Sequence, residues 1–362
     1  MKIACVGYYQ SVGGAEKQLI LLANALAERG HEVSLIVMAD NVISYEVDKR
    51  VRIIDLSVGE RNASKKIVYR FKALKAAYKK IKPDVSVHYW LQSAYLSVLM
   101  KKSIAGKVIY SERADPGDDE YKGMLGVVRK LAFVRIDGFI FQSQGARDYF
   151  NDSVKRRSTV IHNPVFIPKS KFPCPCKERI KKIVNVGRLH PQKNQKLLIE
   201  AFSRIADQFN DYVLEIFGDG ELKEELEGLI LKKKLQDRVL LKGTTSEIFD
   251  EVYSASLFVL SSDYEGMPNA LLEALSLGVP CISTDCKPGG ARSLIKNGKN
   301  GFLVRRNDPK SLAVRMSQVL SNGKLAQKFA DEAYKLSDTH SPEAIFNEYE
   351  AYITGIGTRS AR

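Results

Sequence analysis

Short apolar runs alternate with longer amphipathic segments from the start of the chain. The run KIACVGYY ends at a Gly-Gly turn, AEKQLILLANALAERG carries apolar residues at helical spacing and stops at Gly30, and HEVSLIVMA is a second apolar run. A strand, a helix and a strand in so short a stretch form a βαβ unit, whose strands are parallel. The alternation continues through VRIIDL, DVSVHYWL, KVIYSER, GFIFQS and STVIHNP, which predicts an α/β domain over residues 1–165.

This alternation is interrupted once and then resumes. The stretch NPVFIPKSKFPCPCKERIKK, residues 163–182, is rich in proline and lysine, and we place an exposed interdomain linker within it at 166–180. The runs KIVNVGRL, YVLEIFGDG, VLLKG, LFVLSS and PCISTD, with helical segments between them, predict a second α/β domain at 181–340. The remaining residues, 341–362, contain the helical pattern SPEAIFNEYEAYI, which could cross back onto the first domain.

Both domains are predicted to be Rossmann-like, doubly wound parallel sheets with helices on both faces. In such sheets ligands bind at the carboxyl ends of the strands, so we expect the site in a central cleft between the two domains. The loops that follow the strands are therefore the candidate positions for binding residues.

The composition is that of an ordinary soluble protein. Of 362 residues, 44% are hydrophobic and 27% are charged. The longest uncharged stretch, Val85 to Met100, is too short and too polar to span a bilayer, and the first residues lack the apolar core of a signal peptide. Five cysteines, with one C-x-C at Cys174 and Cys176, predict neither a disulfide framework nor a zinc site. We expect a reduced, cytoplasmic compartment.

The net charge of +14 is concentrated in the first half of the chain. Its densest piece, RNASKKIVYRFKALKAAYKKIK at 61–82, has no acidic residue and predicts a basic amphipathic helix with Ile67, Phe71, Leu74, Tyr78 and Ile81 on its apolar face. The helix is either a solvated helix packed on a core or a docking element for anionic lipid headgroups or substrates. We find no nucleic-acid-binding pattern. The candidate membrane residues are Lys65, Lys66, Arg70, Lys72, Lys75, Lys79 and Lys80.

Two predicted strand-to-helix loops contain glycines and cations suited to phosphate. In GRLHPQKN, Arg188 and Lys193 lie between a strand and a helix that begins near Asn194, so two cations and a helix N-terminus could bind a diphosphate. Surface charge on an ordinary loop is the alternative. In SVGGAEK, Gly13 and Gly14 leave free N–H groups at a helix start, although the pattern is not the dinucleotide fingerprint and a plain tight turn is equally compatible.

Further candidates follow two later strands. In FGDGEL, Gly218 and Gly220 permit a sharp turn, and Asp219 is predicted to act as a carboxylate at the helix start. In LFVLSSDYEGMPNALLEALSLG, Glu265 lies in the loop after a strand, Pro268 is expected to be the first helical residue, and Glu273 falls within the first turns of the helix. Glu273 could face a ligand hydroxyl, or both glutamates could be surface charges.

Taken together, these motifs resemble the retaining glycosyltransferases of family 4, which have the GT-B architecture. The resemblance rests on Gly13-Gly14, on Arg188 and Lys193, on FGDGEL, on the E-x7-E of Glu265 and Glu273, and on the tail STDCKPGGARSLIKNGKNGFLV. It covers nearly the whole chain and is most specific at 183–304.

The resemblance implies a retaining hexosyltransferase that moves a hexose or N-acetylhexosamine from a nucleotide-diphosphate sugar, expected to be a UDP-sugar, without a metal or other cofactor. Arg188 and Lys193 would stabilise the departing diphosphate, Glu265 would bind the sugar hydroxyls and Glu273 the ribose. The base would lie near Lys242 to Thr245. The implied donor-binding residues are Gly13, Gly14, Gly187, Gly218, Asp219, Gly243, Gly266, Met267, Pro268, Asn269, Ala270 and Glu273.

The resemblance also implies that the first domain binds the acceptor, expected to be a polyprenyl-diphosphate-linked glycan in cell-surface polysaccharide assembly at the inner face of the cytoplasmic membrane. Candidates are His88, which could equally be a core histidine, and Glu112 with Arg113, where some relatives have Glu-His. Two alternatives stay open: an inactive peripheral membrane or nucleic-acid-binding protein on a transferase fold, and a sugar-nucleotide epimerase, whose carboxylate and histidine set is not apparent.

Overall fold

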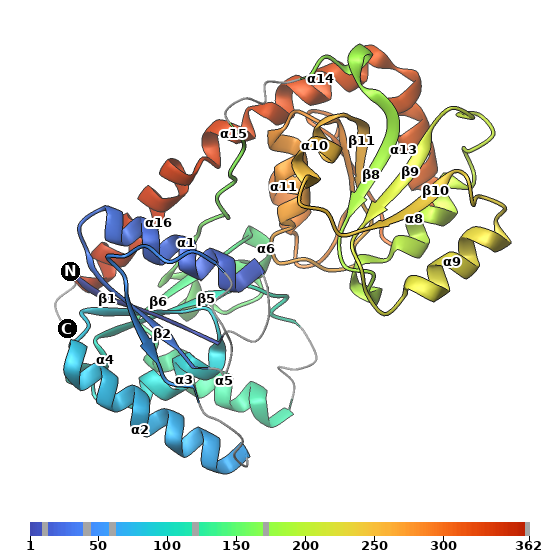
Figure 1. Ribbon diagram of the computed structural model, residues 1–362. Helices are drawn as coiled ribbons and strands as arrows, with labels where there is room; N and C mark the ends of the chain where they lie inside the picture. The colour runs from blue at the N-terminus through green and yellow to red at the C-terminus, as the bar shows by residue number, and fades with distance from the viewer. Residues whose placement is uncertain (9–13, 39–44, 58–62, 118–122, 169–173, 359–362) are drawn as a thin grey trace. The chain divides into compact units, whose positions relative to one another are not determined.

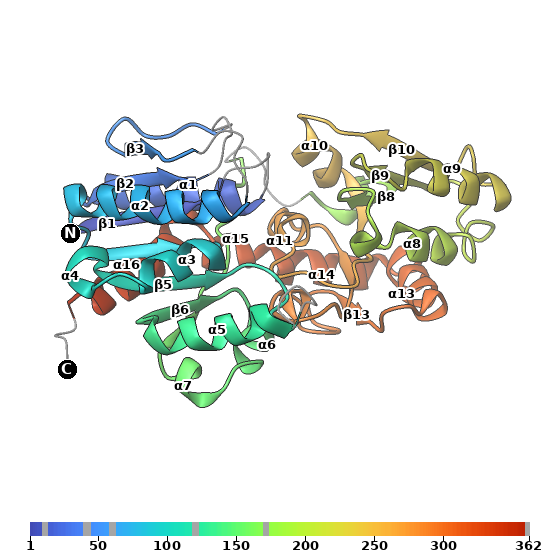
Figure 2. The same ribbon diagram turned by 90° about the horizontal axis from the view of Figure 1, so that it is seen from below.

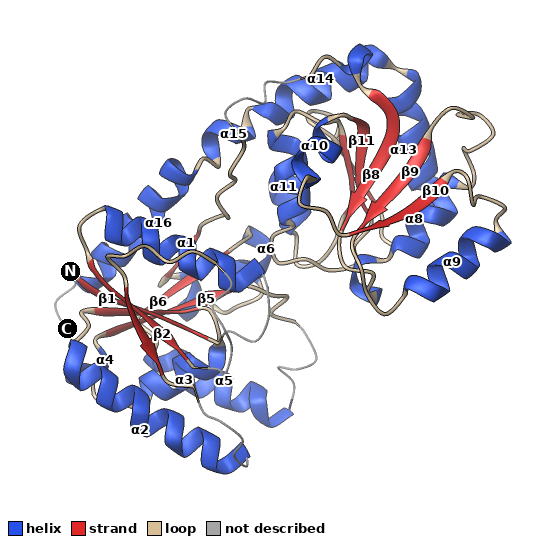
Figure 3. Ribbon diagram, viewed as in Figure 1, coloured by secondary structure: helices blue, strands red, loops and turns tan. Residues whose placement is uncertain are grey.

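The chain forms two α/β units. The computed structural model describes residues 1–8, 14–38, 45–57, 63–117, 123–168 and 174–358. One compact unit comprises residues 1–163 together with 343–362, and the other comprises residues 164–342. In each, helices and strands alternate along the chain (Figure 3). The predicted α/β class with parallel sheets is confirmed.

The first unit is built on a seven-stranded parallel sheet with the strand order β3-β2-β1-β4-β5-β6-β7. One face of this sheet is covered by α1 and α16, and the other by α2, α3 and α5 (Figures 1 and 2). The strands are β1 (Lys2–Gly7), β2 (Glu32–Val37), β3 (Arg52–Asp55), β4 (Val85–His88), β5 (Lys107–Glu112), β6 (Gly138–Phe141) and β7 (Ser158–Val160). The helices are α1 (Gly14–Glu28), α2 (Ala63–Ile81), α3 (Leu91–Val98), α4 (Lys102–Ala105), α5 (Gly123–Arg135), α6 (Gln144–Asp148), α7 (Asp152–Lys155) and α16 (Pro342–Gly357).

The last helix, α16, is part of the first unit although it follows the second unit in sequence. Tyr349, Ile353 and Ile356 are buried in the same apolar core as α1 and β1. The hydroxyl of Tyr352 accepts a hydrogen bond from the N–H of Phe139 in β6 at 3.0 Å. Burial of this apolar stripe is what keeps the end of the chain on the first unit.

The second unit has a six-stranded parallel sheet with the order β10-β9-β8-β11-β12-β13. Helices α8, α9, α13 and α14 pack on one face, and α10, α11 and α12 on the other. The strands are β8 (Ile180–Val186), β9 (Val213–Phe217), β10 (Val239–Gly243), β11 (Ala255–Leu260), β12 (Cys281–Thr284) and β13 (Phe302–Val304). The helices are α8 (Gln195–Phe202), α9 (Lys223–Lys232), α10 (Ile248–Tyr253), α11 (Asn269–Ser276), α12 (Gly290–Leu294), α13 (Pro309–Ser321), α14 (Gly323–Tyr334) and α15 (Leu336–Thr339), with single 3₁₀ turns η2 (Cys176–Glu178) and η3 (Pro191–Lys193).

The strand order reverses between β8 and β11 in this second sheet. The chain moves outward from β8 to β9 and β10, then returns to the other side of β8 as β11. Loops that follow β8 and β11 therefore leave the sheet in opposite directions, which opens a ligand-binding crevice at that point in parallel α/β sheets. The loop after β8 carries Arg188 and Lys193, and the loop after β11 carries Glu265.

The described residues of the predicted linker, 166–168 and 174–180, belong to the second unit. The N–H of Cys176 donates to the side chain of Gln327 at 2.9 Å, and just before the linker the N–H of Val165 donates to the carbonyl of His340 at 2.8 Å. Residues 169–173 lie outside the described part of the chain.

Candidate functional site

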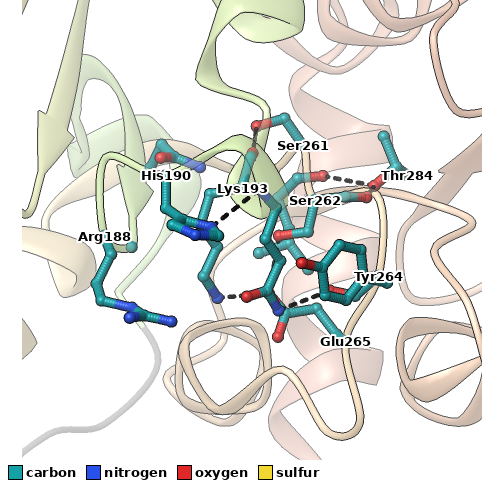
Figure 4. Close-up of polar contacts among 12 residues, drawn as sticks. Arg188, His190, Lys193, Ser261, Ser262, Tyr264, Glu265 and Thr284 are labelled. Atoms are coloured by element: carbon teal, nitrogen blue, oxygen red, sulfur yellow. Dashed lines mark hydrogen bonds and ion pairs between the residues drawn. The ribbon is translucent and has the colours of Figure 1, made fainter. Parts of the chain in front are cut away.

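Lys193 and Glu265 form an ion pair at the strand-order reversal of the second unit. The Lys193 Nζ lies 2.5 Å from Glu265 Oε1, and the Glu265 side chain is only 8% exposed (Figure 4). Lys193 ends the η3 turn after β8, whereas Glu265 lies in the loop after β11. The sequence predicted separate roles for these residues, and the structure brings their charged groups into direct contact.

Two consecutive serines at the end of β11 hold this pair in place. Ser261 Oγ donates to the carbonyl of Lys193 at 2.7 Å, and Ser262 Oγ donates to Glu265 Oε1 at 2.8 Å (Figure 4). Thr284, at the end of β12, donates to the carbonyl of Ser262. Glu265 Oε1 thus receives two donors. Sequence reasoning missed both serines, although a Ser-Ser pair directly after a buried strand is a visible signal.

The loop after β8 is also fixed by its own hydrogen bonds. The His190 ring accepts from the N–H of Gln192 at 3.2 Å, which caps the η3 turn. Asn194 has left-handed backbone angles, and its side chain accepts from the N–H of Leu197 and so begins α8, as predicted. Its amide also donates to the Asp263 carboxylate at 3.2 Å. The N–H of Asp263 donates to the carbonyl of Gln192 at 2.9 Å, so residues on both sides of Lys193 in the chain are bonded to the loop that carries Glu265.

Arg188 is the exposed cation of this site. Its side chain makes no hydrogen bond or ion pair with another residue of the described chain, and Figure 4 shows it beside the Lys193–Glu265 pair without contacting it. Since its guanidinium is not engaged, Arg188 retains its full set of N–H donors for an anionic ligand.

Three glycines end neighbouring strands beneath these side chains. Gly187 follows β8 and donates its N–H to the carbonyl of Phe217 at 2.9 Å, and Gly218 donates to the carbonyl of Gly243 at 2.7 Å. A Cβ on Gly187 would lie 3.2 Å from the Lys193 Cδ, so the lysine stem lies directly on this glycine. Asp219 accepts the N–H of Gly220 instead of capping α9, whose N-cap residue is Leu222; the predicted helix-start role is therefore wrong.

The loop after Glu265 leads directly into α11. Gly266, Met267 and Pro268 lie in this loop, Pro268 is the N-cap residue rather than the predicted first helical residue, and Asn269 and Ala270 begin the helix. Glu273 is half-buried within α11. Gly290 packs closely against this loop, because a Cβ there would lie 2.4 Å from the carbonyl oxygen of Gly266. Sequence reasoning missed this glycine within the tail KPGGAR.

Removing the serine hydroxyl beside Glu265 is expected to destabilise the second unit. Ser262→Ala deletes one of the two donors to Glu265 Oε1, and a hydrogen bond to a buried carboxylate contributes about 1.5–3 kcal/mol, so the free energy of unfolding measured with urea should fall by about that amount. Ser256→Ala, which removes a hydroxyl that donates to the neutral carbonyl of Ile180 at the other end of β11, is the control and should lower the free energy of unfolding by about 1 kcal/mol or less. Equal effects of the two substitutions would contradict this role.

In the first unit, His88 is an interior residue. It ends β4 with no exposed surface, and its Nδ1 lies 2.9 Å from Ser93 Oγ. Burial lowers the pKa of His88 to about 3, so the imidazole is neutral at physiological pH. The structure favours the core-histidine interpretation, because β4 lies inside the sheet and α3 covers its end.

Glu112 and Arg113 end β5 and are both engaged inside the first unit. Glu112 is 2% exposed and accepts from the Tyr110 hydroxyl at 3.1 Å and from the N–H groups of Arg113 and Ala114. Burial raises the pKa of Glu112 to about 7. Arg113 stacks over the Tyr89 ring and donates to Asn163 and to the Tyr349 hydroxyl of α16, each at 2.8 Å. These contacts give Arg113 a clear role in holding α16.

Stability should depend on the protonation of Glu112. Its pKa is raised from 4.5 to about 7 in the folded state, so the folded state binds this proton more strongly and the free energy of unfolding falls as pH rises from about 4.5 to 7. Glu112→Gln mimics the protonated form. The variant should exceed the wild type in stability by about 2–3 kcal/mol at pH 8 and match it near pH 4, as measured by urea unfolding. A difference that is the same at both pH values would show that ionisation of Glu112 is not the cause.

Helix α2 carries its predicted charges but not all of its predicted apolar contacts. Leu74, Tyr78 and Ile81 are buried against β1 and β2 as predicted, and Phe71 packs against the same core. Ile67, one turn nearer the start of the helix, is exposed because it lies beyond this core. Among the basic residues, Lys72, Lys79 and Lys80 are exposed, Lys66 and Lys75 are half-exposed, and Arg70 stacks on Tyr8. The side chain of Lys65 lies outside the described residues, as does Gly13, whereas Gly14 is the first residue of α1.

Among the residues that the structure describes, no group of three or more His, Cys, Asp or Glu side chains is placed to hold a metal ion. None of the described helices combines the length and the apolar character needed to cross a bilayer.

Comparisons with known proteins match both units. The model of glycosyl transferases group 1 matches residues 167–336, and that of glycosyltransferase family 4 matches residues 12–167. An uncharacterized glycosyltransferase of Methanocaldococcus jannaschii is 32% identical, over 86% of this chain and 89% of its own. A Campylobacter jejuni enzyme named GalNAc-alpha-(1->4)-GalNAc-alpha-(1->3)-diNAcBac-PP-undecaprenol alpha-1,4-N-acetyl-D-galactosaminyltransferase is 27% identical over 92% of both chains. The crystal structure of Anabaena HepE with UDP and glucose superposes with a TM-score of 0.81, at 19% identity, covering 98% of this chain and 100% of that one.

Proposed function

Because the chain belongs to the family 4 glycosyltransferases and has the GT-B fold, we propose that it is a retaining enzyme that transfers a hexose or N-acetylhexosamine from a UDP-sugar to a polyprenyl-diphosphate-linked glycan. The observation that carries the proposal is the Lys193–Glu265 pair beside the exposed Arg188. The lipid-linked acceptor is supported by two Campylobacter jejuni relatives whose names describe transfer to diphospho-undecaprenol glycans.

In the proposed reaction, fixed positive charge stabilises the departing diphosphate. Bond cleavage at the anomeric carbon leaves negative charge on the phosphate oxygens, and Arg188 and Lys193 supply N–H donors there without a metal ion. The Lys193 ammonium has three donors, so it can contact the diphosphate while it stays paired with Glu265.

The two glutamates bind the donor in this scheme, and they are not an acid–base pair. Glu265 Oε1 already accepts from Lys193 and Ser262, so Oε2 would accept a sugar hydroxyl. Glu273 would bind the ribose hydroxyls from α11. The leaving phosphate would itself take the proton of the acceptor hydroxyl as the new bond forms on the same face of the sugar, which retains the anomeric configuration. This differs from glycosidases, in which two carboxylates act on the reacting atoms.

A screen of sugar nucleotides tests this function. The purified protein is incubated with UDP-glucose, UDP-galactose, UDP-N-acetylglucosamine, UDP-N-acetylgalactosamine and GDP-mannose, with and without EDTA, and with undecaprenyl-diphosphate glycans as acceptors. We expect turnover of a UDP-sugar that EDTA does not abolish, and an anomeric coupling constant in the product that matches the donor. No hydrolysis or transfer with any of them would refute the enzyme, and an inverted product would refute the retaining mechanism.

We also propose that the protein binds the inner face of the cytoplasmic membrane through α2. The exposed Lys72, Lys79 and Lys80 would bind anionic headgroups, and each such cation contributes about 1 kcal/mol near a charged membrane. Binding to vesicles that contain phosphatidylglycerol should therefore weaken as salt rises from 50 to 500 mM, and the triple change of these lysines to glutamine should lower it about tenfold or more. Equal binding to neutral vesicles would contradict the electrostatic role.

A further inference from the structure

Helix α5 exposes a continuous aliphatic stripe. Val134, Leu131 and Val127 are 76%, 67% and 57% exposed, and Val128 is also exposed. At 100° per residue, Val127, Leu131 and Val134 fall within about 60° of one another. They form one face of the helix, and four large apolar side chains on so short a helix are more than the isolated exposure that needs no explanation.

This stripe is bordered by cations. Lys130 and Arg135 are exposed and fall on either side of it around the helix, and α5 contains no acidic residue. Asp118, Asp119 and Glu120, which precede the helix, lie outside the described residues. An apolar stripe flanked by exposed basic residues is typical of helices that lie in the interface of an anionic bilayer.

The opposite side of α5 is firmly packed, so the orientation of the stripe is fixed. Ala132 and Phe133 are buried in the core with Tyr110 and Phe139. Arg129 is also buried, and it donates to the carbonyl of Pro116 at 2.9 Å. Turning the stripe inward would require breaking this core.

Helices α2 and α5 belong to the same layer of the first unit. Both pack on the face of the sheet formed by alternate residues of β1, β5 and β6, with α3 between them (Figure 2). Near the start of α2, Ile67 and Val68 are exposed as well. A helix that precedes a parallel strand begins at the carboxyl edge of the sheet, so these residues and Val127 lie toward the edge where β5 ends at Glu112.

We propose that α5 is an interfacial helix, which inserts Val127, Leu131 and Val134 among the acyl chains of an anionic bilayer while α2 binds the headgroups. This inference rests on the proposed function, because a lipid-linked acceptor lies in such a bilayer. It adds an apolar contact to the charge of α2, and that contact would bring the carboxyl edge of the first unit close to the membrane surface.

The test compares matched exposed residues on the two units. Leu131→Gln/Val134→Gln removes the centre of the stripe, and Leu231→Gln/Val314→Gln changes a leucine and a valine that are 62% and 56% exposed on α9 and α13 of the second unit. Partitioning of the full-length protein onto vesicles of phosphatidylcholine and phosphatidylglycerol (3:1) is measured by sedimentation in 500 mM salt. The stripe variant should bind at least about tenfold more weakly than the wild type, and the control variant should bind like it.

A second measurement detects insertion directly. Leu131→Trp should show tryptophan fluorescence that is quenched by lipids brominated on the acyl chain, above the signal of Trp90 in the wild type. Unchanged partitioning of the stripe variant, or no added quenching, would overturn the inference and leave α2 as a purely electrostatic contact. If the wild type does not bind vesicles and instead self-associates through a contact that the stripe variant abolishes, α5 is a protein–protein interface and the inference fails. Turnover of sugar nucleotides without vesicles tests the proposed function separately.

Discussion

Arg188→Ala and Lys193→Ala are each expected to lower kcat by about 100-fold or more, since removing one donor from a preorganised anion site has an effect of that size. Both cations lie in the loop after β8, and in the proposed reaction both face charge that develops on the leaving diphosphate. Turnover of the UDP-sugar identified by the screen is the measurement. Lys181→Ala, at the opposite end of β8, is the matched control and should retain wild-type kcat.

The two variants are expected to differ in their free energy of unfolding. Arg188 is exposed and unpaired within the described chain, so Arg188→Ala should unfold like the wild type. Lys193→Ala leaves the buried Glu265 carboxylate with Ser262 as its remaining side-chain donor, which should destabilise the protein by about 1–3 kcal/mol.

A double variant separates the structural effect of Lys193 from its effect on catalysis. Lys193→Ala/Glu265→Gln removes the unpaired charge, so it should regain most of the lost stability while activity stays low. Values of kcat within about threefold of the wild type in both single variants would exclude the diphosphate role. Recovery of activity together with stability in the double variant would show that Lys193 acts only through folding.

Gly218→Ala is expected to destabilise the second unit strongly. The φ of Gly218 is 137°, which L-residues rarely adopt, and an added Cβ would lie 2.1 Å from the carbonyl oxygen of Gly187. Backbone strain and this collision should together lower the free energy of unfolding by about 3 kcal/mol or more, as measured by urea denaturation. Because Gly187 precedes Arg188 and packs under Lys193, UDP affinity should fall as well.

Gly228→Ala is the control for the glycine substitution. Gly228 lies inside α9, and an added Cβ would meet no atom within 4 Å. Alanine favours a helix interior over glycine, so this variant should be more stable than the wild type by about 0.5–1 kcal/mol. An unchanged urea midpoint for Gly218→Ala would show that the end of β9 tolerates a side chain. Gly218 would then not be needed to position the loop that carries Arg188.

Much of the architecture follows from the sequence, because apolar periodicity reports directly on which residues a strand or helix must bury. The alternating runs predicted parallel sheets, and the loops after β8, β9 and β11 were identified as candidate binding positions. Individual side-chain contacts were harder to predict from the sequence. Asp219 was expected at a helix start and instead bonds Gly220, because the chain makes a further turn before α9 begins at Lys223.

By itself, the sequence determined the α/β class, placed Arg188, Lys193 and Glu265 in loops that follow strands, and placed Glu273 in the first turns of the next helix. Only the tertiary structure decided that Lys193 and Glu265 form a pair, that Ser261 and Ser262 hold it, and that α5 presents an aliphatic stripe outward. The reason is physical. Periodicity describes what each segment buries, whereas these contacts depend on which strands become neighbours: β8 and β11 are adjacent in the sheet although β9 and β10 separate them in the chain.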